Sequence, residues 1–428
     1  MPETLPAHVD LDAIARRVGT PFYLYSADVL RRRIADVRAI APGGMLQARY
    51  AMKACSIRRL LELVREAGVW IDAVSGNEAL RAHAAGFAAG AAPPVILLTA
   101  DVFRDNALEV VRQHGILPNI GSPGMLAALL RAGYRGPIGV RVNPGFGHGH
   151  VQETDTGGPS SKHGIWHEDL DAVRDAAARA ECPIILLHAH VGSGPQIDEF
   201  NANMGNLERF LDERVADFPD LQGVNFGGGI PHPYRPGMPS IDLTPLGRIL
   251  QAAQRRLSDR ARRPLRVEIE PGRYLAAPCA WLVARVTDIK ATRTNEKGPG
   301  HTFVMADAGF VDLVRPAMYG AYHHITVHGA PPDAPAQPLV VAGPLCESGD
   351  VFTRDAAELL QPRPLPLPRV GDLLVLHDAG AYGMTMSSNY NSIGRAPQVW
   401  IENGRASLAS RRETLADVTR TECFEPLD

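Results

Sequence analysis

Lys53 follows a short apolar run, in the sequence YAMKACS, and its amine is the group in this chain best suited to covalent chemistry. A lysine at the end of a strand can hold an aldehyde as a Schiff base when neighbouring groups bind the rest of that molecule. Because most lysines are solvated surface charges, Lys53 alone is weak evidence. The prediction therefore depends on the motifs that accompany it.

Three consecutive glycines, Gly227, Gly228 and Gly229, follow another apolar run and could turn their backbone N–H groups towards a phosphate. A glycine triplet by itself is more often a flexible turn. Arg273 in EPGR and Ser193 in HVGSG add a charged donor and a hydroxyl donor, two groups that bind phosphate well. Together these residues predict a phosphate site.

Glu270 ends the run RVEIE, where its carboxylate could face a pyridine nitrogen and keep it protonated. The alternative is a structural ion pair with a neighbouring arginine. In HAH (188–190), His190 is suited to stack on an aromatic cofactor, and His188 is expected to be a buried core histidine. Two histidines at this spacing share a strand face, as metal ligands can, but no third ligand follows at a recognisable spacing, so we expect no metal. With Lys53, these residues predict pyridoxal 5'-phosphate as the cofactor.

Cys346 lies in GPLCESGD, a glycine-flanked turn in which Glu347 is the next residue. A free cysteine is commonly a small buried hydrophobe. An acidic turn bracketed by glycines is a poor place for such a residue, and a thiol near a carbanion could return a proton to it. We expect Cys346 to be the proton donor, with Lys53 as the competing candidate. No role is assigned to HGH (148–150) or to His323 and His324, which are expected to lie in loops.

Between residues 45 and 272, short apolar runs alternate with helical stretches. Eight β/α units in this length are typical of a closed parallel (β/α)8 barrel, a TIM-like fold. Runs such as VILLTA fit strands that are buried on both faces. An open doubly wound sheet is the alternative. The candidate strands are residues 46–52, 69–74, 95–100, 116–121, 138–143, 184–191, 223–228 and 266–270.

After Gly272 the chain changes to strand-like runs separated by Gly and Pro clusters, which predicts an all-β second domain, a β-barrel or sandwich. The β-rich segment PFYLY (21–25) is expected to add a strand to it. We therefore expect a cofactor-binding barrel at residues 36–280 and a β domain made of residues 1–35 and 281–428, which carries the GPLCESGD loop. In a closed barrel the carboxyl ends of all strands meet on one face, so the candidate groups after strands one, six, seven and eight should converge there.

Composition excludes several classes of protein. The formal net charge of −3, with no long run of like charges, argues against nucleic-acid binding. No stretch approaches the roughly 18 apolar residues of a membrane span, and the start of the chain does not resemble a signal peptide. The five cysteines are odd in number and contain no C-x-x-C pair, so neither a disulfide framework nor a zinc site is encoded. We expect a cytoplasmic protein.

Nine sequence blocks together resemble the fold-type III pyridoxal phosphate decarboxylases, and within them the diaminopimelate decarboxylases. The resemblance runs from about residue 20 to beyond residue 400. The blocks are YAMKA, RVNPGFGHGH, SKHGI, HAHVGSG, GGG, EPGRY, RPAMYG, GPLCESGD and GAYGMTMSSNYNS. The resemblance implies that Lys53 forms the Schiff base, that His190 stacks on the ring and that Glu270 partners the pyridine nitrogen. It implies further cofactor contacts to the phosphate from Ser193, Gly229, Arg273 and Tyr382.

The same resemblance implies the substrate-binding residues Arg273, Arg315, Tyr319, Glu347 and Tyr382. It also implies a head-to-tail homodimer in which Cys346 and Glu347 serve the active site of the other chain. The expected reaction is decarboxylation of meso-2,6-diaminopimelate to L-lysine and CO2, the last step of lysine biosynthesis. That substrate has a distant carboxylate, which suits Arg315 and Arg273, and a distant ammonium, which suits Glu347.

Other functions remain open at this point. The family often has Asn after the lysine motif and Arg-Pro after SSNYNS, whereas this chain has Cys55-Ser56 and Ile393-Gly394-Arg395. The alternative is therefore a related decarboxylase that acts on another amino acid or on a secondary-metabolite intermediate. A barrel protein that only carries the cofactor would end after the barrel. An amino-acid racemase shares the two-domain plan but commonly uses a tyrosine base, and nothing in this sequence favours it over GPLCESGD.

Overall fold

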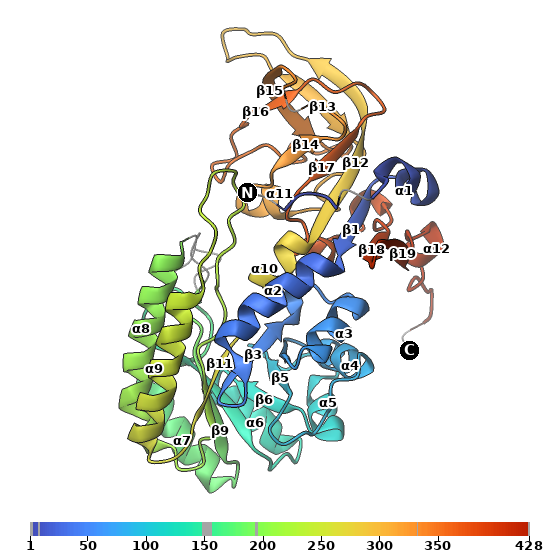
Figure 1. The fold of residues 1–428 in the computed structure, drawn as a ribbon. Helices are drawn as coiled ribbons and strands as arrows, with labels where there is room; N and C mark the ends of the chain where they lie inside the picture. Colours follow the sequence, from blue (N-terminus) through green and yellow to red (C-terminus); the bar gives the residue numbers. More distant parts are fainter. Residues whose placement is uncertain (1–2, 7–8, 148–155, 193–195, 332, 427–428) are drawn as a thin grey trace. The chain divides into compact units, whose positions relative to one another are not determined.

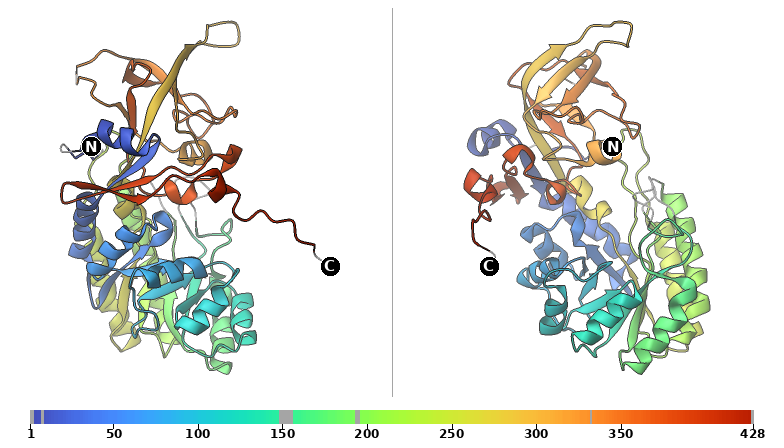
Figure 2. Two further views of the ribbon diagram at one scale, coloured as in Figure 1. Left: turned by 90° about the vertical axis from the view of Figure 1, so that its right-hand side faces the viewer. Right: turned by 180° about the vertical axis from the view of Figure 1, so that it is seen from behind.

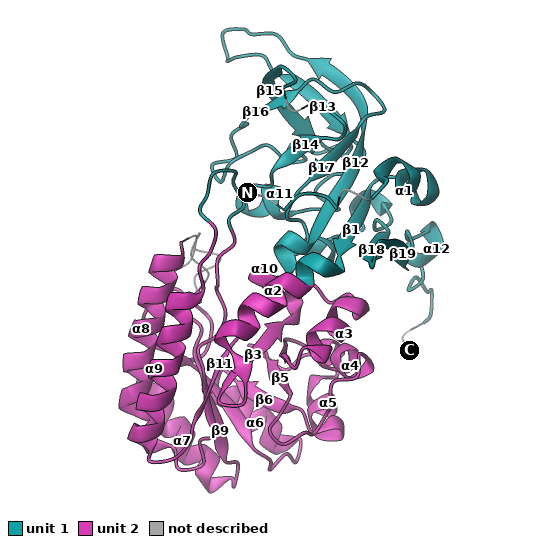
Figure 3. Ribbon diagram, in the orientation of Figure 1, with its two compact units in different colours: residues 1–30, 233–239, 276–428 teal, residues 31–232, 240–275 magenta. Residues whose placement is uncertain are grey.

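The computed structural model describes residues 3–6, 9–147, 156–192, 196–331 and 333–426 (Figure 1). The chain divides into two compact units (Figure 3). The barrel unit comprises residues 31–232 and 240–275, and the sheet unit comprises residues 1–30, 233–239 and 276–428.

The described part of the barrel unit contains a closed ring of parallel strands. Its strands are β3 (Leu46–Ala51), β4 (Trp70–Ala73), β5 (Ile96–Thr99), β6 (Leu117–Ile120), β7 (Ile138–Asn143), β9 (Ile184–His188), β10 (Gly223–Asn225) and β11 (Arg266–Ile269). The ring closes because β11 pairs with β3, with Val267 opposite Leu46. Every residue of β5, β6, β7 and β9 is buried, as strands covered on both faces require. The closure confirms the predicted (β/α)8 barrel and excludes the open doubly wound sheet.

A buried ion pair reinforces the closure. Arg49 on β3 donates from Nε to Oε2 of Glu268 on β11 over 2.5 Å, and both side chains are almost fully buried. The Arg49 guanidinium also lies 4.7 Å from the ring centroid of Trp70 on β4. Two short strands flank the ring, β2 (Pro42–Gly43) antiparallel to β3 and β8 (Ile165–Trp166) parallel to β7.

Helices follow the strands of the barrel, and side-chain caps fix where two of them begin. Ser75 accepts a hydrogen bond from the backbone N–H of Glu78, and the Glu78 carboxylate accepts one from Val74 N–H at 2.8 Å. Ser122 caps the helix after β6 in the same way, and Pro123 occupies its first turn. These local hydrogen bonds fix the strand-to-helix turns at the carboxyl end of the barrel.

The helices of the barrel unit are α3 (Arg58–Glu66), α4 (Gly76–Ala84), α5 (Ala107–His114), α6 (Pro123–Arg131), α7 (Leu170–Arg179), α8 (Ile197–Arg214) and α9 (Thr244–Ala261). Helices α8 and α9 pack side by side (Figure 2). Two more helices, α2 (Ala27–Ile40) and α10 (Arg273–Ala276), each contain a boundary between the units. None of the helices within the described residues combines the length and apolar character needed to cross a membrane.

The sheet unit is built on a mixed sheet that agrees with the expected β domain. Its described strands are β1 (Phe22–Ser26), β12 (Ala280–Ala291), β13 (Thr302–Ala306), β14 (Ile325–Val327), β15 (Ala336–Ala342), β16 (Arg363–Pro366), β17 (Leu373–Leu376), β18 (Gln398–Glu402) and β19 (Arg405–Ser410). β1 is wholly buried and lies between β12, to which it is antiparallel, and β18, to which it is parallel. The unit also contains the short helices α1 (Leu11–Val18), α11 (Arg315–Tyr319) and α12 (Leu415–Val418).

One segment leaves the barrel unit. Residues 233–239 lie in the sequence between β10 and α9, yet they cluster with the sheet unit. The alternation of apolar runs and helical stretches gave no sign of this excursion.

Candidate active site

Lys53 lies at the carboxyl end of β3, in a short 3-10 turn (Met52–Ala54). Its neighbours Met52 and Ala54 are fully buried, whereas Lys53 itself is exposed. The turn is joined to the end of β11, because Ala51 N–H donates to the carbonyl of Pro271 over 3.2 Å. Burial of its neighbours therefore anchors the turn and leaves the Lys53 amine available at the mouth of the barrel.

The glycine triplet packs against two of the other candidate residues. A Cβ on Gly227 would lie 2.6 Å from Cβ of His190, and a Cβ on Gly228 would lie 2.3 Å from the backbone oxygen of Glu270. Gly229 has a φ of +112°, and a Cβ there would lie 2.3 Å from the Gly192 carbonyl oxygen. These contacts cannot form with any side chain present. The triplet is therefore a close-packed cradle rather than the flexible turn that such a sequence commonly forms.

Glu270 is a buried carboxylate, and its nearest polar partners are an amide and an imidazole. Asn225 Nδ2 donates to Oε1 over 2.6 Å, and Nε2 of His188 lies 3.4 Å from Oε2. Burial alone would raise the pKa of Glu270, but His188, His190 and the Asn225 hydrogen bond lower it to about 2. Within the described residues no arginine pairs with Glu270, and the imidazole near its carboxylate is that of His188. His188 is buried, as expected of a core histidine, and in addition faces Glu270.

His190 has a neutral ring at neutral pH. Burial, followed by the nearby charges of Arg141 and Lys53, lowers the pKa of His190 well below its usual value. Its Nδ1 is buried and has no hydrogen-bond partner within the described residues. A flat, neutral imidazole beside the glycine cradle is suited to stacking on an aromatic ring.

Two carboxyl groups that sequence reasoning missed also lie in the electrostatic environment of Lys53. Asp72 on β4 is buried, and its Oδ1 has no hydrogen-bond partner in the part of the chain that the structure describes. Burial and then the charge of Glu270 raise the pKa of Asp72 well above its usual value, while the charge of Lys53 opposes that change. Burial also raises the pKa of Glu78. An acid inside the apolar run VWIDAV was the signal that could have identified Asp72.

The remaining barrel-side candidates are Arg273, Ser193 and the HGH sequence. Arg273 is half-buried and begins α10, directly after the residues that contact the Lys53 turn. A Cβ on Gly272 would lie 3.2 Å from Cβ of Ala51, so the EPGR turn packs closely on the end of β3. Ser193 and residues 148–150 lie outside the described residues.

The other candidate residues belong to the sheet unit. Arg315 and Tyr319 are the first and last residues of α11, Arg315 is buried, and Tyr382 is half-buried with a φ of +59°. Cys346 and Glu347 are both exposed. The expectation that this turn does not bury an inert thiol agrees with that exposure.

Asp350 holds the turn that carries Cys346. Its carboxylate accepts hydrogen bonds from the backbone N–H of Leu345 at 2.8 Å and of Phe310 at 2.7 Å. A Cβ on Gly343 would lie 2.3 Å from Asp350 Oδ2, so glycine is needed where the turn begins. The exposed thiol of Cys346 thus lies on a turn whose conformation is held by the Asp350 carboxylate.

These groups fit pyridoxal phosphate. The barrel unit brings together an accessible lysine amine, a neutral histidine whose Nδ1 has no partner among the described residues, a glycine cradle and an ionised carboxylate. The amine suits an aldehyde, and the histidine suits an aromatic ring. The glycine cradle suits a phosphate, and the carboxylate suits a pyridine nitrogen.

Comparison with known proteins agrees with this chemistry. The family model described as "Pyridoxal-dependent decarboxylase, pyridoxal binding domain" matches residues 27–277. Diaminopimelate decarboxylase of Streptomyces coelicolor is 42% identical over 99% of this chain and 94% of its own length. The enzyme of that name from Escherichia coli K12 is 42% identical over 94% of both chains.

Solved structures give the same result. A crystal structure of diaminopimelate decarboxylase matches with a TM-score of 0.88 and 41% identity, over 96% of this chain and 95% of that one. The Helicobacter pylori enzyme complexed with L-lysine matches with a TM-score of 0.83 and 26% identity, over 96% and 98% of the two chains. The chain belongs to the diaminopimelate decarboxylase family of pyridoxal-dependent decarboxylases.

Proposed function

We propose that the enzyme removes CO2 from meso-2,6-diaminopimelate and releases L-lysine. The observation that carries this proposal is the similarity to diaminopimelate decarboxylases over nearly the whole chain, including both units. The polar groups of the sheet unit agree with it, because a substrate with an amino acid at each end needs partners for a distant carboxylate and a distant ammonium.

The barrel-side residues would hold the cofactor. In this assignment the Lys53 amine binds its aldehyde, His190 stacks on its ring, and the backbone of Gly227 to Gly229 binds its phosphate with Ser193, Arg273 and Tyr382. Bound there, pyridoxal phosphate supplies the electron sink for the electron pair that decarboxylation leaves behind. Glu270 is ionised at any pH well above 2. Its carboxylate would therefore hold a proton on the pyridine nitrogen.

The substrate-binding residues would recognise the end of the substrate that does not react. Arg315 and Arg273 would bind the distal carboxylate as charged donors, and Glu347 would accept from the distal ammonium. Tyr319 and Tyr382 would add hydroxyl contacts. Ornithine has a distal amine but no distal carboxylate, so an arginine such as Arg315 would gain nothing from it.

One proton completes the reaction. When the bond between Cα and the carboxylate breaks and CO2 leaves, Cα must receive a proton. Cys346 is our preferred donor because its thiol is exposed on a turn with a fixed base. We propose that the enzyme is a homodimer in which the Cys346 and Glu347 turn serves the partner subunit. We also propose a cytoplasmic location, which the five free cysteines support.

Product analysis tests the proposed reaction. Purified, cofactor-loaded enzyme is incubated with meso-diaminopimelate and, in parallel, with ornithine, arginine and L-lysine. We expect CO2 and L-lysine from diaminopimelate alone, and we expect Lys53→Ala to abolish both turnover and covalent attachment of the cofactor. Turnover of ornithine or arginine instead would move the enzyme to the alternative, a related decarboxylase with another substrate. Full turnover by Lys53→Ala would contradict the assignment of the lysine.

A further inference from the structure

The excursion at residues 233–239 brings an aromatic ring to Arg315. The ring centroid of Tyr234 lies 4.7 Å from Cζ of Arg315, within the range of a cation–π interaction. The next residue, Arg235, lies 4.5 Å from the ring centroid of Tyr322, three residues beyond α11. These two contacts give a physical reason why residues 233–239 cluster with the sheet unit.

His323 contacts the same guanidinium from another side. Its Nε2 lies 2.8 Å from Nη1 of Arg315, and its Nδ1 lies 2.9 Å from the carbonyl oxygen of His377. A guanidinium can only donate and a carbonyl can only accept. The two neighbours therefore place the proton of His323 on Nδ1 and leave the lone pair of Nε2 for Arg315. His323 must be neutral to make both contacts.

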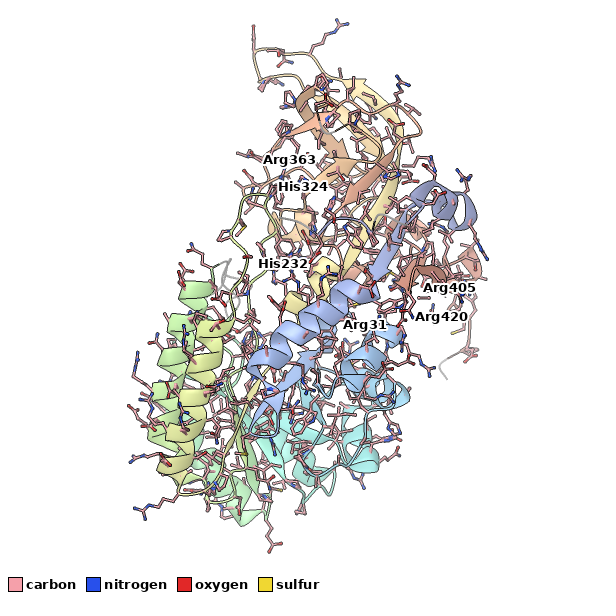
Figure 4. All side chains as sticks on the ribbon, in the orientation of Figure 1. Arg31, His232, His324, Arg363, Arg405 and Arg420 are labelled. Carbon is pink, nitrogen blue, oxygen red and sulfur yellow. The ribbon has the colours of Figure 1, made fainter. Side chains whose placement is uncertain are left out.

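The strands hold His323 in place. It precedes β14, whose pairing with β17 sets Ile325 opposite Leu376, and His377 N–H donates to the carbonyl of His324 over 2.8 Å. His323 is only 1% exposed. Figure 4 labels the neighbouring His324. The carbonyl that fixes the His323 ring thus belongs to the residue directly after β17.

The ring of Tyr234 also meets the ring of His323. Their centroids lie 5.5 Å apart and their planes are inclined at 71°, an edge-to-face arrangement. Arg315, Tyr234 and His323 therefore contact one another in all three pairs, and we call this group the Arg315 clamp. Two of its members are aromatic and none is acidic, so these contacts direct the guanidinium without neutralising it.

We infer that Tyr234 and His323 are positioning residues that fix the direction of the Arg315 guanidinium and thereby set the preference for ligands with a distal carboxylate. This inference rests on the proposed function, in which Arg315 binds that carboxylate. A free arginine side chain samples many rotamers and loses that freedom when it binds. In the clamp the guanidinium is already ordered, so less freedom is lost when the carboxylate arrives.

Binding of two ligands that differ by one carboxylate tests the clamp. L-lysine and cadaverine have the same carbon chain and amines, but only lysine carries the carboxylate. Their affinities for the holoenzyme are measured by calorimetry for the wild type, His323→Phe, His323→Gln and Tyr234→Leu. We expect His323→Phe and Tyr234→Leu to weaken lysine binding about tenfold and to change cadaverine binding less than about twofold.

Two further variants separate positioning from support of the fold. His323→Gln keeps an acceptor for Arg315 and is expected to stay within about threefold of the wild type for lysine. His328→Phe makes the same substitution just beyond β14, outside the clamp, and should change neither affinity. Equal weakening of lysine and cadaverine in His323→Phe and Tyr234→Leu, or no change in their ratio, would overturn the inference.

Turnover of meso-diaminopimelate in the same preparations separates this inference from the proposed function. If the wild type turns over meso-diaminopimelate but the ratio of lysine affinity to cadaverine affinity is the same in the clamp variants, the inference about the clamp is wrong and the proposed function stands. If the wild type does not turn over meso-diaminopimelate but the ratio of lysine affinity to cadaverine affinity falls in the variants, the inference about the clamp stands and the proposed substrate is wrong. If the wild type binds the two ligands equally, the inference about the clamp is wrong, and turnover alone decides the proposed function.

Discussion

At the mouth of the barrel, Glu270 and Asp72 are two buried carboxyl groups whose pKa values move in opposite directions. Histidines and an amide donor lower the pKa of Glu270 to about 2 despite its burial. Burial, assisted by the charge of Glu270, raises that of Asp72. Asp72 therefore keeps its proton to a higher pH than Glu270 does. A pair separated in this way can give Lys53 one charged and one uncharged acid as neighbours.

The raised pKa of Asp72 predicts a pH-dependent effect of Asp72→Asn. Above pH 3.8 the unfolded chain releases the Asp72 proton while the folded protein retains it, so wild-type stability falls as the pH rises towards the folded pKa. Asparagine has no titratable group, so its side chain contributes no such pH dependence to stability. We expect the cofactor-free variant to be more stable than the wild type at pH 7, with the difference vanishing near pH 4. Denaturant unfolding between pH 4 and 8 measures it, and a difference that does not vary with pH would contradict the assignment.

At the scale of elements, the sequence was most informative where burial is complete. All eight barrel strands lie within their predicted ranges, because strands such as β5 and β9 are covered on both faces and read as unbroken apolar runs. The glycine triplet was also recognisable, although its close packing was not. The role of Tyr234 could not be predicted, because its contact with Arg315 depends on the path of residues 233–239, and no local pattern encodes that path. His323 was noticed in the sequence but given no role, because its contact with Arg315 depends on the pairing of β14 with β17.

The glycine cradle predicts a sharp effect of one methyl group. In Gly228→Ala the new Cβ would lie 2.3 Å from the backbone oxygen of Glu270, so the cradle or the end of β11 must move. We expect cofactor affinity to fall at least tenfold, as measured by titrating the cofactor-free protein and following its absorbance. Gly205→Ala is the control, because that glycine lies within α8 with no atom within 4 Å of the added Cβ. The control should be unchanged in affinity and about 1 kcal/mol more stable. Equal affinity in both variants would remove the cradle from the cofactor site.

At the scale of the whole molecule, the proposed chemistry is divided between two units. The groups proposed for the reactive end of the cofactor belong to the barrel unit, and Arg315, Cys346 and Glu347 belong to the sheet unit. In the proposed homodimer the Cys346 turn of one chain completes the site of the other. Two variants that are each inactive could then restore one intact site when they share a dimer.

Co-expression of Lys53→Ala with Cys346→Ala tests this arrangement. Random pairing makes half of the dimers mixed, and each mixed dimer has one site with both residues intact. We expect about a quarter of the wild-type activity, compared with the low activity of each variant alone. If the mixture is no more active than the sum of its parents, the two residues act within one chain.

The place of β1 has a consequence for synthesis of the chain. β1 ends at residue 26 but needs β12, which begins at residue 280, and β18, which begins at residue 398. The barrel strands, between residues 46 and 269, leave the ribosome long before β18 does. Chain synthesis proceeds at about 5–20 residues per second, so roughly 20–75 s pass between the synthesis of the apolar segment FYLYS and that of β18. The first strand to emerge is thus among the last to be covered, and until then its apolar residues lack the strand neighbours that bury them in the folded protein.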